Sequence, residues 1–200
     1  MSLKKTLAML ALGIAIAAGG MLARQVFAVT AEAGPEQLHQ AILDYIAERN
    51  PKVSTRALEG FPEVLLAEAG RVGIDHCLAL AQAEVESDFR PDAVGRAGEI
   101  GLFQLLPSTA AALEPVGGKL RDLGDLADPV VSTRFAMAYL RDIRTRKPAM
   151  KAALTEYNGG RHYYGRVMGA YVEILERPEL RCRLREGPRP QSLLARLGWA

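Results

Sequence analysis

The stretch HCLALAQAEVES, residues 76–87, decides the fold. Its apolar side chains occur on most sides of a helix, which is typical of a helix that is buried in a core. Asp75 is a suitable N-cap before this stretch, and Arg90-Pro91 ends it. We therefore expect one central helix, His76 to about Ser87, around which the rest of the domain is built.

Helical patterns continue on both sides of this stretch. Proline, glycine and Asn-Pro signals bound them at 35–49, 62–69, 107–113, 129–146, 148–158 and 166–175. Gly70 is expected to stop the second of these. Gly95, Gly98 and Gly101 indicate an irregular loop over 91–101, although residues 95–104 could hold a small hairpin. The sequence therefore predicts a mainly α architecture with a single helical domain and no internal repeat.

Composition limits the function classes. The chain has 200 residues, of which 49% are hydrophobic, and this is enough for a real core. A formal net charge of +2 gives no global reason to expect nucleic-acid binding. A zinc site built from His76, Cys77 and Cys182 is not expected, because no paired ligand spacing is present.

The N-terminus has the pattern of an export signal. Lys4 and Lys5 precede an apolar segment at 7–18, and Val26-Phe27-Ala28 supplies the small residues that a signal peptidase reads. We expect cleavage after Ala28, so that residues 1–28 are a signal peptide. The alternative is an uncleaved inner-membrane anchor, since the 17 residues of 7–23 are apolar throughout and stand at the short limit for a spanning helix.

Export changes how the two cysteines are interpreted. In an oxidising compartment, Cys77 and Cys182 are more often bridged than free. A bridge would close a loop of about 105 residues and contribute on the order of 4 kcal/mol in the chain-entropy model. The alternative is one buried thiol and one idle thiol in the tail, and the sequence leaves both open.

The central helix carries two acids, and burying an unpaired carboxylate costs free energy, so each acid needs an explanation. Glu84 and Glu86 differ by about 200° around the helix, so they cannot share one site. Glu86 lies on a face of small residues just before the glycine-rich loop, where desolvation would raise its pKa and suit a general acid. The alternative is a structural ion pair between Glu86 and Arg90, its i+4 neighbour.

Five sequence blocks occur in an order and spacing that resemble the soluble lytic transglycosylase (SLT) domain family, which is related in fold to goose-type lysozyme. The blocks are Glu86-Ser87-Asp88-Phe89, Gly101-Leu102-Phe103-Gln104, Pro107-Ser108-Thr109-Ala110, Asp128-Pro129 leading to Tyr139-Leu140, and Tyr157-Asn158-Gly159-Gly160. The resemblance spans about residues 61–176. It leaves an N-terminal helix and linker at 29–60 and an arginine-rich tail at 177–200, whose composition is typical of a solvated, partly disordered end.

The resemblance implies a role for each matching residue. Glu86 would be the single catalytic acid and base. Ser87 and Gln104 would contact substrate around the scissile sugar, and Phe103, where the family usually has methionine, would form an apolar wall. Tyr157 and Asn158 would face the glutamate.

The chain also departs from the family pattern. Glu156 stands where a small residue is usual and brings a second carboxylate near the site. Val167 replaces a glutamate that many members carry in the last core helix. Ser132 and Ala136 replace an asparagine and a glycine, which is a change in packing.

The implied activity is peptidoglycan lytic cleavage of the MurNAc–GlcNAc β-1,4 bond in the periplasm, giving 1,6-anhydro ends without metal or organic cofactor. One alternative is a lysozyme-type hydrolase in which Glu156 or Asp88 positions water. Another is a catalytically silent wall-binding or assembly protein. The short interval between Tyr157-Asn158 and Tyr171-Val172 resembles members that serve secretion or conjugation systems, whose components could bind at 35–49 or at the tail.

Overall fold

The computed structural model describes residues 34–113 and 118–183. The predicted signal segment 1–28 and the tail residues 184–200 lie outside them. The chain divides into two units, Met1–Glu36 and Gln37–Ala200, and the core and the candidate site belong to the second. None of the helices within the described ranges combines the length and hydrophobicity needed to cross a bilayer.

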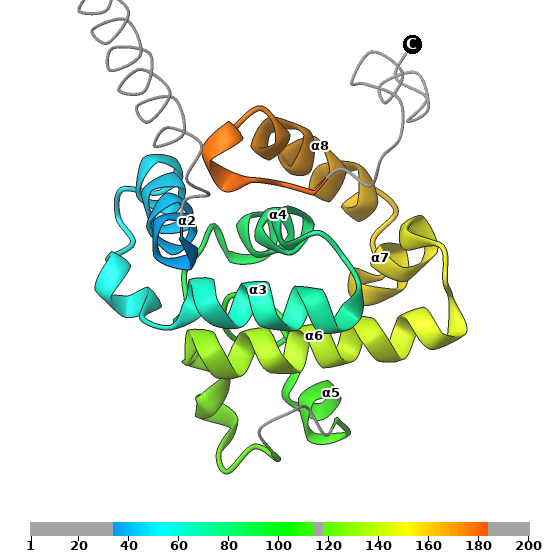
Figure 1. Cartoon of the computed structure of the whole chain (residues 1–200). Coiled ribbons are helices and arrows are strands. Elements are labelled where there is room, and N and C mark those ends of the chain that lie inside the picture. The colour runs from blue at the N-terminus through cyan, green and yellow to red at the C-terminus, as the bar shows by residue number, and fades with distance from the viewer. Residues whose placement is uncertain (1–33, 114–117, 184–200) are drawn as a thin grey trace, which may run out of the picture. The chain divides into compact units, whose positions relative to one another are not determined.

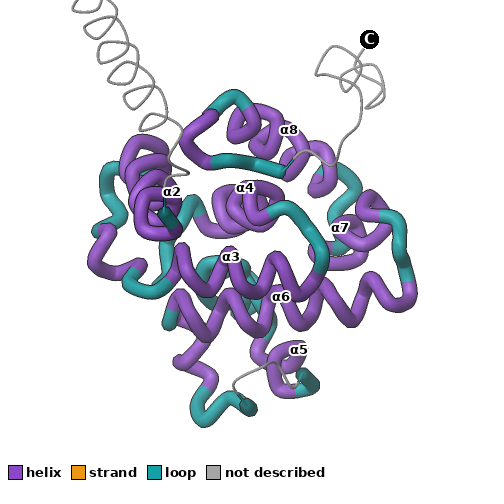
Figure 2. Tube along the Cα trace, in the orientation of Figure 1, coloured by secondary structure: helices purple, strands orange, loops and turns teal. Residues whose placement is uncertain are grey.

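The described residues form α-helices joined by short 3-10 turns, as Figures 1 and 2 show. In chain order these are α2 (Pro35–Arg49), η1 (Thr55–Leu58), α3 (Phe61–Val72), α4 (His76–Ser87), α5 (Pro107–Ala111), η2 (Leu123–Ala127), α6 (Pro129–Arg146), α7 (Met150–Asn158), α8 (Tyr163–Leu175) and η3 (Pro178–Leu180). No strand occurs in 34–113 or 118–183. The predicted mainly α fold is therefore confirmed.

Helix α4 lies at the centre, between α3 and α8 (Figure 1). Its side chains Cys77, Ala79, Leu80, Ala81 and Ala83 are all 0% exposed, as the apolar pattern predicts. The Asp75 carboxylate caps the helix by accepting a hydrogen bond from the Cys77 N–H at 3.1 Å. It also accepts one at 2.8 Å from the hydroxyl of Tyr171 on α8, so the start of α4 is held by its neighbour as well as by its own cap.

Three helices have the predicted bounds, namely 35–49, 76–87 and 129–146. The predicted stop at Gly70 is wrong, because α3 continues to Val72 and ends at Gly73, whose φ is +70°. A glycine inside a helix costs only about 1 kcal/mol, which the packing of α3 on α4 and α6 offsets. Helix α8 begins at Tyr163 rather than 166, since the buried Tyr163 side chain (1% exposed) anchors its first turn in the core.

Two other helices are shorter than expected. Helix α5 ends at Ala111 instead of 113, and α7 begins at Met150 instead of 148. The glycine-rich segment is an irregular loop, with isolated antiparallel bridges between Val94 and Ile100 and between Ile100 and Leu105 in place of a regular hairpin.

A disulfide joins Cys77, in the first turn of α4, to Cys182, with the two Cα atoms 5.5 Å apart. This is the bridged alternative of the two that the sequence leaves open. Leu180 is 0% exposed, and its carbonyl oxygen lies 2.8 Å from Nε2 of His76. Leu180 and the Cys182 disulfide therefore hold this first part of the tail to the domain, while Pro178, Glu179, Arg181 and Arg183 are exposed to solvent.

Removing the disulfide should lower stability without changing the fold. Because the bridge closes a loop of 105 residues, the C77A/C182A variant should lose about 4 kcal/mol of unfolding free energy. Denaturant unfolding followed by far-UV circular dichroism measures this loss, with reduced wild-type protein as the matched control. Equal midpoints for oxidised and reduced wild type would contradict a stabilising bridge.

Candidate active site

Glu86 lies in the last turn of α4, where the helix reaches the glycine-rich loop. Its side chain is half-buried, while Gln82, one turn earlier on the same face, is 0% exposed. The helix ends in two residues with positive φ, Asp88 at 55° and Phe89 at 60°. Glu86 therefore stands at a rigid helix end with one side open to solvent.

That open side is a cleft of about 250 Å³. Its walls come from α4, the glycine-rich loop, α5, α6 and α7. The lining residues are Glu86, Gly95, Arg96, Glu99, Gln104, Leu105, Leu106, Thr109, Tyr139, Tyr157 and Asn158. Three of the residues that the resemblance assigns to substrate, Gln104, Tyr157 and Asn158, thus share the cleft with Glu86.

The loop that carries Gln104 is held in place by its backbone. Gly101 has φ +85°, and a Cβ atom there would lie 2.0 Å from the carbonyl oxygen of Leu126, so only glycine fits. Gln104 itself has φ +46°, and its amide nitrogen donates to the carbonyl oxygens of Ala93 (3.1 Å) and Gly101 (3.0 Å). These bonds fix the Gln104 side chain at the cleft wall.

Ser87 and Phe103 do not reach the cleft surface. The Ser87 hydroxyl is buried and lies 2.9 Å from the carbonyl oxygen of Leu102, to which it donates, so it ties the loop to α4. The Phe103 ring is 0% exposed, and its carbonyl oxygen accepts a hydrogen bond from the Tyr157 hydroxyl at 3.1 Å. Ser87 and Phe103 were expected to contact the sugar. In the structure both side chains are buried behind the wall of the cleft, and neither lines it.

Burial raises the pKa of Glu86 to about 7, mainly because its carboxylate is desolvated. Tyr163 and Asn158 act against this rise through polar contact, and Arg166 acts against it through its charge, while the negative charge of Glu99 adds to it. A carboxyl group with this pKa is part protonated near neutral pH, so it can both give and take a proton.

Aromatic side chains form the wall beyond Glu86. The centroid of the Tyr157 ring lies 5.1 Å from that of Tyr139 and 6.3 Å from that of Tyr163. The Tyr157 and Tyr163 rings are stacked, with 8° between their planes. Burial raises the pKa of Tyr157 and Tyr163 well above the ordinary value, so both hydroxyls stay protonated. Tyr139 and Tyr157 therefore form an aromatic wall of the cleft, and Tyr163 packs behind it.

Tyr163 is a site residue that the sequence did not predict. Its buried hydroxyl approaches Glu86 and Gln82, but it makes no hydrogen bond of good geometry, and both polar atoms of the Gln82 amide are likewise unpaired. Arg166 covers the Tyr163 ring at 5.8 Å. The only sequence signal was a tyrosine a few residues after Tyr157-Asn158, which has no special meaning without the fold.

The acids proposed for water positioning lie elsewhere. Glu156 pairs with Arg146 and Lys147, each at 2.6 Å, and these two cations lower its pKa. Asp88 accepts a hydrogen bond from Asn50. Neither acid lines the cleft, so the structure corrects both assignments. Arg90, the alternative partner of Glu86, donates instead to the carbonyl oxygen of Ser87 at 3.0 Å.

Glu99 is the second carboxylate of the cleft, and sequence reasoning missed it. Its carboxylate accepts a hydrogen bond from the Ala97 N–H at 3.0 Å. A Cβ atom on Gly95 would lie 2.3 Å from the Glu99 carboxylate and 2.7 Å from the Gln104 amide oxygen. The position of Gly95 in the glycine-rich loop was therefore the available signal, because that glycine makes room for two polar side chains.

No metal site is evident within the described part of the chain. The group of potential ligands found there, Asp75, Cys77 and Cys182, includes both sulfurs of the disulfide, which are not free thiolates. The chemistry of the cleft therefore has to be argued from its side chains.

The helical architecture of the described residues, with a carboxyl group of raised pKa in the cleft, is consistent with the lysozyme-like class of folds. Residues 63–172 match the Transglycosylase SLT domain family, and this match covers more than half of the chain. The chain belongs to that family.

Two similar proteins share the name membrane-bound lytic murein transglycosylase C. The protein of Histophilus somni strain 2336 is 33% identical over 120 residues, which cover 54% of this chain and 32% of that protein. The protein of Haemophilus influenzae strain PittGG is 34% identical over 119 residues, covering 54% and 33%. This chain thus matches about a third of the length of these relatives.

The charges of Arg166 and Glu99 act on the pKa of Glu86 in opposite directions, so removing each should shift the pH profile of activity in opposite directions. Activity that needs protonated Glu86 should fall as pH rises through about 7. R166Q removes a cation that lowers the pKa of Glu86, so the falling limb should move to higher pH. E99Q removes an anion that raises this pKa, so the limb should move to lower pH. The pH profile of kcat/KM measures both, and shifts in the same direction would contradict these assignments.

Proposed function

We propose that this protein is a peptidoglycan lytic transglycosylase in which Glu86 acts first as general acid and then as general base. One observation carries the proposal, namely a half-buried carboxyl group with a pKa of about 7 that shares a cleft with Gln104, Tyr157 and Asn158. Family membership supports the same reaction, since the named relatives are lytic murein transglycosylases.

In the first step, protonated Glu86 gives its proton to the β-1,4 glycosidic oxygen that follows N-acetylmuramic acid. The bond from C1 to that oxygen breaks, and the N-acetyl group of the substrate stabilises the positive charge that develops at C1. Desolvation keeps a substantial fraction of Glu86 protonated near neutral pH, and this fraction can carry out the first step.

In the second step, the Glu86 carboxylate takes the proton of the muramic C6 hydroxyl, whose oxygen closes on C1. The product has a 1,6-anhydro end, and no water is consumed. The polar neighbours Tyr163 and Asn158 favour the carboxylate form of Glu86 between the two steps. The cleft supports the reaction by holding the C6 hydroxyl close to C1, which replaces a separate reactant.

A lysozyme-type hydrolase is the second candidate, and Glu99 is the observation that favours it. Most glycosidases use two carboxylates, one of which activates water. Glu99 lines the same cleft as Glu86, and it replaces Glu156 and Asp88 as the candidate base. The reaction would then give reducing ends in place of anhydro ends.

We place the protein in the bacterial envelope, outside the inner membrane. The export pattern at 1–28 and the disulfide support this location. The relatives are named as membrane-bound enzymes, which agrees with it. A specialised role beside a secretion or conjugation apparatus is supported by the short interval between Asn158 and Tyr171. In that case the arginine-rich tail is the proposed place for a partner.

The E86Q variant tests the proposed function directly. Purified peptidoglycan is incubated with wild type or E86Q, and mass spectrometry identifies the soluble products. Wild type should release anhydromuramic ends, and E86Q should lower the rate by about 10²- to 10⁴-fold, because a positioned acid contributes that much.

Two controls separate the candidates. E156Q is a matched control, because it makes the same change at an acid that lies outside the cleft, and it should retain the wild-type rate. Reducing ends from wild type would replace the transglycosylase with the hydrolase, and E99Q should then abolish them. Wild-type protein that binds peptidoglycan but releases nothing would support the silent binding protein.

A further inference from the structure

The end of the catalytic helix is a strained turn. Asp88 and Phe89 both have positive φ, a backbone conformation that is strained for any residue except glycine. The turn follows Glu86-Ser87 directly, and it sends the fully buried Phe89 ring into the core. Its geometry therefore fixes where Glu86 stands, and it needs support from outside the helix.

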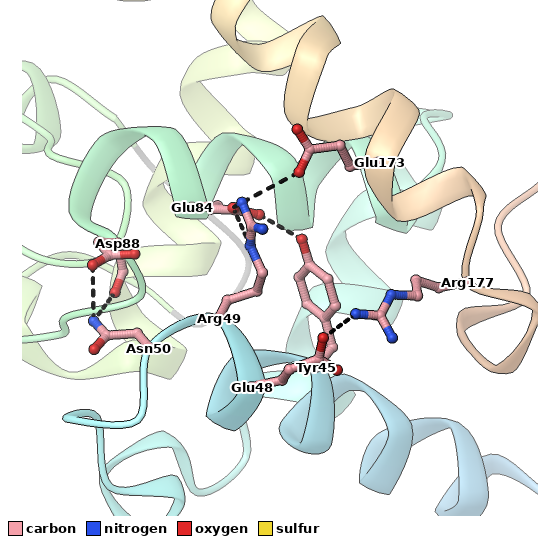
Figure 3. Close-up of polar contacts among 8 residues, drawn as sticks. All are labelled: Tyr45, Glu48, Arg49, Asn50, Glu84, Asp88, Glu173 and Arg177. Carbon is pink, nitrogen blue, oxygen red and sulfur yellow. Dashed lines mark hydrogen bonds and ion pairs between the residues drawn. The ribbon is translucent and has the colours of Figure 1, made fainter.

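Asn50 supplies that support. Its side-chain amide donates to the backbone carbonyl oxygen of Asp88 at 2.7 Å and to the Asp88 carboxylate at 3.0 Å (Figure 3). Asn50 is only 6% exposed, and its amide oxygen accepts from the Lys52 N–H at 3.2 Å. Its own N–H donates to the carbonyl oxygen of Ile46 at 2.8 Å, so the residue is held at the end of α2.

Helix α2 is anchored on the other side of Glu86 by a second set of contacts. Glu84 accepts hydrogen bonds from the Tyr45 hydroxyl at 2.6 Å and from Arg49 at 2.8 and 2.5 Å (Figure 3). The Tyr45 ring also meets the Phe89 ring edge-on at 6.1 Å. The helix thus holds α4 two residues before Glu86 and two residues after it.

The same helix is tied to α8 and to the segment that follows α8. Arg49 lies 3.3 Å from the Glu173 carboxylate, and Arg177 pairs with Glu48 (Figure 3). Together with the bonds to Glu84, these contacts join α2 to α4, which carries Glu86, and to α8, which carries Tyr163 and Arg166. Because the family match begins at residue 63, α2 and Asn50 are an addition to the matched region.

We propose that Asn50 is a positioning residue for Glu86, and that α2 is a brace that fixes the end of the catalytic helix. This inference rests on the proposed function. Without the Asn50 amide, the Asp88-Phe89 turn loses the contacts that offset its strain and relaxes, and Glu86 moves relative to the bound sugar. Gln104, Tyr157 and Asn158 lie on other elements, so sugar binding is retained.

The N50A variant should therefore lower kcat and leave KM almost unchanged. We expect a fall of about tenfold in kcat, since a small misplacement of a reacting group has a large effect on the rate. Q40A is the matched control, because Gln40 lies on the same helix, is exposed and donates its side-chain hydrogen bond to Asp44 within that helix. Both constants are measured from the release of anhydro ends from soluble glycan strands.

A second-site variant separates positioning from general stability. Glycine adopts positive φ at no steric cost, so N50A/D88G should recover kcat to within about threefold of wild type. A structural loss caused by the missing Asn50 side chain would not be repaired by removing the Asp88 side chain as well. An N50A kcat equal to that of Q40A, or a double variant as slow as N50A, would overturn the proposal.

A further measurement does not depend on turnover. Carbon-13 NMR titration of the Glu86 carboxyl group should give a pKa closer to the ordinary glutamate value in N50A, because a loosened helix end admits water. The groups that face Glu86 from the other elements are unchanged in this variant, namely Glu99, Asn158, Tyr163 and Arg166. An unchanged pKa of Glu86 in N50A would overturn the role of α2 as a brace. A wild type that released no anhydro product would overturn only the proposed function, and the titration would still test the brace.

Discussion

The burial of α4 is the constraint on which the rest of the structure depends. A helix with six side chains of 0% exposure must be surrounded. Helices α3 and α8 pack against it, and α2 reaches it through Tyr45 and Arg49. The same packing partly buries Glu86 in the last turn, and this desolvation raises the pKa of Glu86. The packing around α4 therefore both stabilises the domain and raises the pKa of Glu86.

Local signals predicted the parts of the fold that local physics determines. Asp75 and Asp128-Pro129 predict where two helices begin, because hydrogen bonds within the first turn are enough to fix a helix start. Both starts are confirmed. Gly70 failed as a stop signal because tertiary packing outweighs a small propensity cost. The start of α8 was missed because it depends on where Tyr163 is buried, which a periodicity cannot show.

The candidate site divides in a similar way. Motif order pointed to Glu86, Gln104, Tyr157 and Asn158, and the structure brings these four together in one cleft. Motif order alone could not separate residues that touch the cleft from those that support it, and Ser87 and Phe103 belong to the support. Glu99, Tyr163 and Asn50 escaped attention because their importance comes from distant neighbours, which no spacing along the chain records.

The disulfide also determines an order of events during maturation. Cys182 is synthesised 105 residues after Cys77, so the covalent ring cannot close until nearly the whole described domain exists. The chain has two cysteines in total, so one intramolecular pairing is possible and no wrong isomer has to be reshuffled. Closure of the ring therefore reports that synthesis has passed Cys182, and a domain truncated before that residue can never acquire it.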